Sequence, residues 1–207
     1  ATFGVTGAHN IWWILGALAL GIIPAWFKAK SVAMTAMPQQ VALYNGMGGG
    51  SAAAIGAVEL LRFSAEGSAP SRVVLSAAVI GALIGAVSLT GSIIAWAKLD
   101  GVLDKRFTFP GQQYINLLVF LAAALAGAYL FLGLDVRVII AFFVLALLFG
   151  VMMTLPIGGA DMPVVISLFN AFTGLAVAFE GFVLQNEALI IAGMVVGAAG
   201  MLLTQLM

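Results

Sequence analysis

Two amides and one carboxylate stand out in this sequence as groups that could do chemistry. Asp161 and Asn170 lie in the stretch GGADMPVVISLFNAFTG (158–174), and Asn45 lies in MPQQVALYNGMGGG (37–50). Each asparagine follows a Met-Pro pair at the same spacing and has apolar surroundings. An amide in an apolar helix must hydrogen-bond to a neighbouring helix or to water. The pattern therefore predicts either helix-packing residues or two amides that hold water in a polar path.

The composition places these groups in a membrane. Of the 207 residues, 63% are hydrophobic and 8% are charged, and the mean hydropathy is +1.18. Soluble domains are about 45–50% apolar and about 25% charged. The formal net charge is zero, so we expect a lipid bilayer and no nucleic acid as a partner. Without cysteine and with a single histidine, the sequence predicts no disulfide and no metal site.

The elements that position these groups are predicted to be membrane-spanning helices. A helix needs about 20 apolar residues to cross the hydrocarbon core, and nothing in the sequence alternates as a barrel strand does. We therefore predict an all-α polytopic membrane protein with short connections, so that consecutive helices are antiparallel neighbours. The predicted spans are 10–27, 38–61, 72–97, 113–134, 136–156, 163–184 and 187–206.

The positions of the basic residues predict the orientation. Lys28, Lys30, Lys98, Lys105 and Arg106 would lie on one side, and Arg62, Arg72 and Arg137 on the other. Because basic loops favour the cytoplasm, we expect the C-terminus and Asp161 at the cytoplasmic face.

Two pairs of segments look alike and suggest a parallel internal repeat. Residues 37–56 align without gaps on residues 162–181, and small residues then follow at the same spacing in the next spans. Such stripes let helix backbones pack closely. The stripes are Gly81, Gly85, Ser88 and Ser92 in one span and Gly193, Gly197, Gly200 and Thr204 in the other. Chance similarity of apolar segments is the alternative to a repeat.

Three further polar residues have no assigned role. For Glu59 and Glu180, near the outer ends of their spans, we favour snorkelling to the headgroups, and the entrance of a proton relay is the alternative. His9, at the start of the first span, is expected to be a solvated end residue.

The hydroxyls of Ser88, Thr90 and Ser92 could each bond the backbone of their own helix. The segment GMGGGS follows no strand, so it predicts no dinucleotide loop.

Three stretches together resemble one family. MTAMPQQVALYNGMGGG, SLTGSIIAWAKL and LPIGGADMPVVISLFNAFTG, with the glycine helix AGMVVGAAG, are similar to the membrane part of the β subunit of proton-translocating NAD(P) transhydrogenase. The resemblance covers essentially the whole chain, in order. It implies that residues 1–207 form a transmembrane proton-channel domain. Proton movement would be coupled to hydride transfer between NAD(H) and NADP(H), which occurs in domains that this chain lacks.

The resemblance also implies partners and a location. We expect α-subunit membrane helices, a peripheral NAD(H)-binding domain and an NADP(H)-binding domain after the C-terminus, in a dimer of the complete unit. This chain itself would hold no cofactor and would be a part of a longer subunit. The bacterial cytoplasmic (inner) membrane is favoured over the mitochondrial inner membrane.

Site residues are carried over by position. Asp161 matches an acidic residue facing the NADP(H) domain. Asn170 matches an asparagine of the proton path, deeper in the membrane, and Ser92 matches the serine of a TGS motif. Some members have histidine where this chain has Asn45, and an amide cannot take up a proton near neutral pH. A histidine on a partner helix is therefore the expected proton carrier. The glycines expected to matter for conformational change are Gly193, Gly197 and Gly200.

Two other functions fit the residues alone. A secondary transporter for a small solute would explain the repeat, the amides and the broken LPIGGADMP connection. A structural membrane subunit would explain Asn45 and Asn170 if both bonded only to helix backbone.

Overall fold

The computed structural model describes residues 10–67, 70–103 and 105–207, and this part of the chain is entirely helical apart from turns. The predicted all-α class is therefore confirmed. His9 lies outside the described residues. The α-helices are α1 (Ile11–Ser31), α2 (Met37–Glu66), α3 (Arg72–Leu99), α4 (Gln112–Tyr129), α5 (Val136–Thr154), α6 (Met162–Val183) and α7 (Glu187–Leu206).

The chain forms two compact units, residues 1–37 and residues 38–207. In the first unit, α1 is mostly apolar, has Lys28 and Lys30 in its last turn, contains Pro24, and is followed by the 3-10 helix η2 (Met34–Ala36). The second unit holds the remaining helices and all the site residues with described positions.

Local signals explain where several helices begin. Side chains at the N-caps accept a backbone hydrogen bond at the start of α3 (Ser71), α5 (Asp135) and α7 (Asn186). The helix α6 has a proline in its first turn, where a missing N–H costs nothing. The Met-Pro pairs at the starts of α2 and α6 each follow a 3-10 turn, η2 or η3 (Gly159–Asp161). This local likeness leaves the internal repeat a prediction.

Six of the described helices are long and apolar enough to cross a membrane. The exception is α2, which has 30 residues but includes glutamine, asparagine, glutamate and arginine side chains. Its polar residues Asn45 and Glu59 are buried inside the protein, so they lower the hydropathy of α2 without facing lipid.

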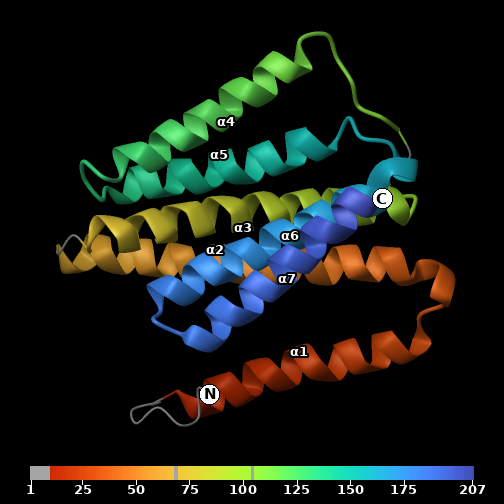
Figure 1. The fold of residues 1–207 in the computed structure, drawn as a ribbon, viewed down its shortest axis with the longest axis horizontal. Helices are drawn as coiled ribbons and strands as arrows, with labels where there is room; N and C mark the ends of the chain where they lie inside the picture. The colour runs from red at the N-terminus through yellow and green to blue at the C-terminus, as the bar shows by residue number, and fades with distance from the viewer. Residues whose placement is uncertain (1–9, 68–69, 104) are drawn as a thin grey trace. The chain divides into compact units, whose positions relative to one another are not determined.

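The helices of the second unit pack in a defined order (Figure 1). Contacts run from α4 to α5, α3, α6 and then α7, and glycines of α2 lie against α3. The prediction that consecutive helices are antiparallel neighbours is not met by extensive packing between α3 and α4 or between α5 and α6. The helix α5 packs extensively against α3, and α3 packs against α6. Half or more of α3 and of α6 is buried, so these two helices form the centre of the unit.

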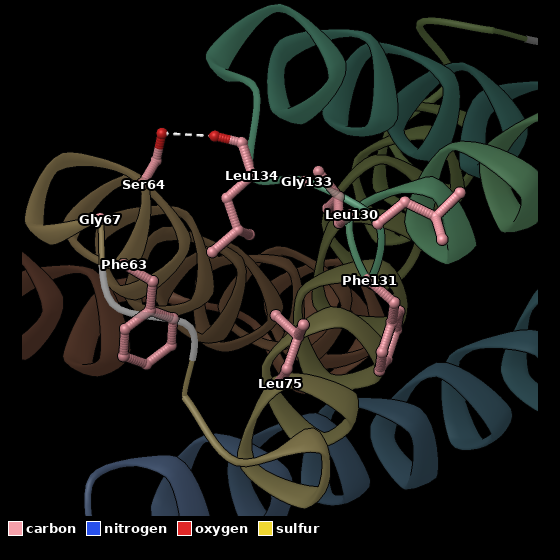
Figure 2. A pocket seen from close by; sticks show the side chains of 9 residues that line it. Phe63, Ser64, Gly67, Leu75, Leu130, Phe131, Gly133 and Leu134 are labelled. Atoms are coloured by element: carbon pink, nitrogen blue, oxygen red, sulfur yellow. Dashed lines mark hydrogen bonds between the residues drawn. The ribbon is translucent and has the colours of Figure 1, made fainter.

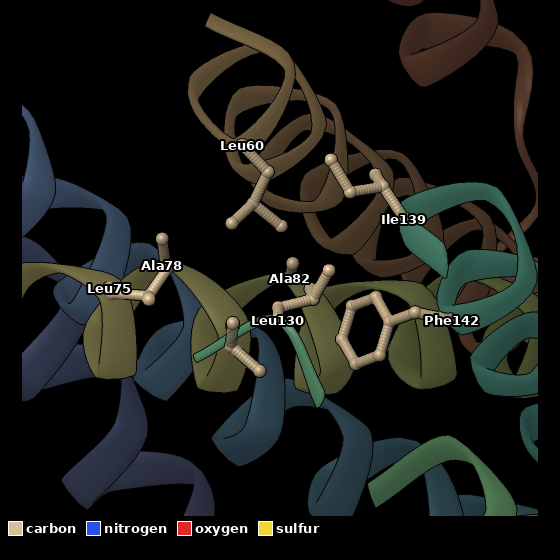
Figure 3. Packing of buried hydrophobic residues seen from close by; sticks show 8 residues of the cluster. Leu60, Leu75, Ala78, Ala82, Leu130, Ile139 and Phe142 are labelled. Carbon is tan, nitrogen blue, oxygen red and sulfur yellow. The ribbon is translucent and has the colours of Figure 1, made fainter. Parts of the chain in front are cut away.

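An apolar cluster holds α2, α3 and α5 together at one end of the bundle (Figure 3). Leu60 of α2, Ala78 and Ala82 of α3, and Ile139 and Phe142 of α5 are fully or almost fully buried in it. Burial of a large apolar side chain away from water contributes about 1.5–3 kcal/mol. This cluster fixes α2, α3 and α5 relative to one another near the polar site described next.

Candidate functional site

Asn45 and Ser92, predicted separately, form a pair. The side-chain amide of Asn45 in α2 donates to the hydroxyl oxygen of Ser92 in α3 over 2.9 Å, and both residues are buried. The close approach needs Gly46, because a Cβ there would lie 3.2 Å from the Cβ of Ser92. Asn45 thus bonds a side chain on another helix, not only helix backbone.

A second polar pair lies about one helical turn away along α3. The hydroxyl of Ser88 donates to the carbonyl of Phe169 in α6 over 3.1 Å, and it lies 2.5 Å from the hydroxyl oxygen of Thr173. Since Ser88 has one hydroxyl proton, Thr173 donates to Ser88. Gly48 and Gly49 of α2 face Thr173 and Ser88 respectively. Three helices therefore meet at this level.

The three hydroxyls of the SLTGS segment behave differently. Thr90 bonds Ala86 of its own helix and also Leu147 of α5, whereas Ser88 and Ser92 bond across to α6 and α2. The sequence allowed all three to bond their own helix. All three hydroxyls find a partner outside α3, and the packing of α2, α5 and α6 against α3 decides which partner each one has.

Glu180 of α6 is buried among the same three helices. Its residue is 1% exposed, and neither carboxylate oxygen has a hydrogen-bond partner among the described residues. The prediction that Glu180 snorkels to the headgroups is wrong, because α2 and α3 cover it. Glu59 of α2 is also largely buried, and one of its oxygens lies 3.7 Å from the exposed guanidinium of Arg62.

Asn170 is half-buried on α6, about one turn before Thr173. Its side chain makes no hydrogen bond to another residue that the structure describes. The residues one turn further along α6 face different helices. Thr173 points to α3 and α2, whereas Gly174 lies against Gly197 of α7. Asn170 therefore lies at the edge of the polar group, not within it.

Asp161 lies at the start of α6 in a connection held by two cations. Its carboxylate is exposed and lies 3.6 Å from the guanidinium of Arg106. The ammonium of Lys98, at the end of α3, donates to the carbonyls of Leu155 and Ile157. Sequence reasoning used Lys98 and Arg106 only for orientation and missed this role. For Arg106, its opposite charge to Asp161 was the available signal.

The glycines of α7 form a close contact with α6. Gly193 and Gly200 are buried against the backbone of Ala178 and Ala171 respectively. The hydroxyl of Ser167 donates to the carbonyl of Gly200 over 3.1 Å. The expected small-residue packing is confirmed, while a conformational role for these glycines stays a prediction.

One pocket lies apart from these groups, at the end of α2 (Figure 2). It has a volume of about 240 Å³, and the Ser64 hydroxyl donates to the Leu134 carbonyl at its edge over 2.6 Å. Its lining is otherwise mostly Leu, Phe and Gly, and none of the lining residues is titratable. The pocket therefore offers no acid–base chemistry.

The fold and the site define a polytopic α-helical membrane protein with buried polar groups between its central helices. The family model described as NAD(P) transhydrogenase beta subunit matches residues 1–207. Two relatives, both named NAD(P) transhydrogenase subunit beta and both from Rhodospirillum rubrum, are each 37% identical over 200 residues. The matches cover 94% of this chain and 43% of each relative. The chain belongs to the NAD(P) transhydrogenase beta subunit family and spans less than half the length of these relatives.

Proposed function

We propose that this chain is the membrane part through which protons cross in a complete NAD(P) transhydrogenase. Other domains of that enzyme would transfer hydride between NAD(H) and NADP(H). The observation that carries the proposal is a column of buried polar groups between α2, α3 and α6. It comprises the Asn45–Ser92 pair, the Ser88–Thr173 pair, Glu180 and Glu59.

The column covers about two thirds of the distance that a transmembrane path must cross. Asn45 and Glu59 are fourteen residues apart on α2, or about 21 Å at 1.5 Å per residue. The hydrocarbon core is about 30 Å thick. On α3, Ser88 belongs to the second polar pair, and Gly81 lies beside the Glu180 carboxyl group. These two positions are about 10 Å apart along the helix. Water must bridge this gap for a proton to pass, so the packed arrangement corresponds to a closed path.

Coupling to the nucleotide is assigned to the end of the bundle that carries Asp161. The exposed Asp161–Arg106 pair lies there, where an NADP(H)-binding domain following the C-terminus would dock. The basic residues favour the cytoplasmic side for this end. A proton crossing about 100 mV supplies about 2.3 kcal/mol. This energy changes a binding equilibrium about fiftyfold, enough to bias NADP(H) affinity.

The complete enzyme would include partners that supply what this chain lacks. Asn45 donates a hydrogen bond to Ser92 but cannot carry a proton as histidine does. We assign that role to a histidine on an α-subunit membrane helix, in line with the half-buried position of Asn170 at the edge of the column. An NAD(H)-binding domain, a dimer of the complete unit and the bacterial cytoplasmic membrane complete the proposal.

The test uses the complete complex in sealed proteoliposomes. NADPH-driven reduction of an NAD analogue is followed while the pH of the lumen is recorded. We expect linked turnover and pH change, with both lost in Asn170→Ala and Asn45→Ala. Asn116→Ala is the matched control, because Asn116 bonds the Met152 carbonyl in the α4–α5 pair, away from the column. Hydride transfer without a pH change in the unmutated complex would refute the proposal.

A further inference from the structure

The carboxyl group of Glu180 is the one site feature whose burial demands a chemical explanation. Both oxygens are enclosed without a hydrogen-bond partner among the described residues, and the residue is 1% exposed. Transferring an ionised carboxylate into such surroundings without a partner is very costly. A neutral carboxylic acid costs much less, so this burial favours the protonated form of Glu180.

Glycines on two helices make the space for this carboxyl group. A Cβ at Gly56 of α2 would lie 2.6 Å from one Glu180 oxygen, and a Cβ at Gly81 of α3 would lie 2.6 Å from the same oxygen. A side chain at either position would displace the carboxyl group from this place. The sequence therefore combines a glutamate on α6 with a glycine, which has no side chain, on each of α2 and α3. This is a built site, not an isolated buried acid.

We propose that Glu180 is a proton-binding site that is loaded and unloaded during each transport step. The inference rests on the proposed function. When the gap between Glu180 and the Ser88–Thr173 pair holds water, a hydronium ion gives its proton to the Glu180 carboxylate and becomes water. When water instead reaches Glu180 from the Glu59 side, the O–H bond of the carboxylic acid breaks. The proton then passes through water to the Glu59 carboxylate.

The charged groups around the site support this direction of transfer. On α2, Glu59 lies one turn beyond Gly56 and is paired with Arg62, which also pairs with Glu66. On α3, the charged residues Arg72 and Lys98 lie nine and seventeen positions from Gly81. Glu187 of α7 is exposed at the start of its helix. Among the charged residues of α2, α3 and α7, Glu59 is therefore the nearest to Glu180 along the helices, and it is paired with the exposed Arg62.

Closed packing on the other side explains how the site could be gated. Between Glu180 and Ser88, the α2 and α3 backbones touch, because a Cβ at Gly85 would lie 2.8 Å from both Ala53 N and Gly49 O. Water can enter this stretch only if α2 and α3 separate. Small shifts of such glycine contacts would decide whether Glu180 faces the Asp161 end or the Glu59 end.

The test compares Glu180→Gln and Glu180→Asp in the complete complex in proteoliposomes. Glutamine preserves size but cannot exchange a proton, and aspartate keeps the carboxyl. We expect Glu180→Gln to lower the proton-coupled rate about a hundredfold and to flatten its pH dependence, with partial rescue by Glu180→Asp. Glu187→Gln, an exposed glutamate on α7, is the matched control and should behave like the unmutated complex.

The outcomes separate the two proposals. If the unmutated complex moves no protons, the proposed function fails. If it pumps and Glu180→Gln pumps equally well with the same pH dependence, only the role of Glu180 fails. Should Glu180→Gln not assemble, infrared difference spectroscopy on exchanging NADP⁺ for NADPH decides. A carboxylic-acid carbonyl band that shifts in Glu180→Asp supports the proposal, and a band unchanged by both nucleotide and substitution overturns it.

Discussion

Two helix interfaces in this protein use the same spacing of small residues and differ in what they place between the helices. The stripe on α3 (Gly81, Gly85, Ser88 and Ser92) meets α2 and α6, and its hydroxyls bond side chains or backbone of those helices. The stripe on α7 (Gly193, Gly197, Gly200 and Thr204) meets α6 backbone to backbone. There Thr204 bonds only the Gly200 carbonyl of its own helix.

The comparison shows that spacing sets how closely two helices approach, while the partner helix decides what the polar groups do. A hydroxyl on α3 finds Asn45 or Thr173 opposite it. The hydroxyl of Thr204 bonds back along α7, and the cross-helix bond comes instead from Ser167 of α6. We therefore expect α2–α3–α6 to carry the proton path and α6–α7 to carry a contact that resists added volume.

The largest effect is expected from adding one methyl group to the α6–α7 contact. In Gly193→Ala, the new Cβ would lie 2.5 Å from Ala178 N and from Gly174 O, both backbone atoms that cannot move independently. Overpacking costs about 1–3 kcal/mol or more, against about 1 kcal/mol gained in helix propensity. We expect a net loss of about 2 kcal/mol, measured by unfolding of the purified chain in detergent.

Gly197→Ala is the matched control on the same stripe. Its Cβ would lie 3.5 Å from Ala171 O, an ordinary contact, so stability should hold or rise slightly. If Gly197→Ala were as destabilising as Gly193→Ala, the interface would not be the rigid backbone contact described. If Gly197→Ala kept its stability but lost proton-coupled turnover, we would infer that the α6–α7 contact moves during the transport cycle. The contrast between a rigid α6–α7 contact and a proton path between α2, α3 and α6 would then weaken.

A loss of similar size is expected from removing the cation that ties α3 to the connection before α6. Lys98→Met keeps the apolar stem but loses the bonds to the Leu155 and Ile157 carbonyls. Hydrogen bonds from charged groups contribute about 1.5–3 kcal/mol, so we expect a loss of about 2 kcal/mol by the same unfolding measurement. Lys105→Met, at an exposed lysine nearby, should change stability little. Equal effects of the two substitutions would refute an anchoring role for Lys98.

The polar pairs in the column should contribute less to stability than to transport. A double-mutant cycle of Ser88→Ala and Thr173→Val isolates their hydrogen bond, and such bonds between membrane helices average about 0.6 kcal/mol. We expect a coupling of that size, together with a marked loss of proton-coupled turnover in both single variants. A coupling of several kcal/mol with turnover intact would make the pair a structural lock like the α6–α7 contact.

Much of this arrangement could be predicted from the sequence, because apolar runs and breakers define helices locally. The helix α7 ends at the predicted residue, and α2 extends from 37 to 66 where 38–61 was predicted. What could not be predicted depends on contacts between distant segments. Glu180 near a span end was expected to reach the headgroups, but Gly56 and Gly81 lie 124 and 99 positions earlier in the chain and enclose it.

The Asp161–Arg106 pair lies exposed at the start of α6, and here we expect the smallest effect on stability. Both side chains are more than half exposed, and exposed ion pairs contribute about 0.2–1 kcal/mol and weaken with salt. Asp161→Asn should therefore leave unfolding nearly unchanged. If Asp161 senses a docked NADP(H) domain, the same variant should change the dependence of turnover on NADP(H) concentration. Arg106→Gln is the comparison: an equal change in both variants would assign the effect to the ion pair, and a change in Asp161→Asn alone would assign it to the carboxylate.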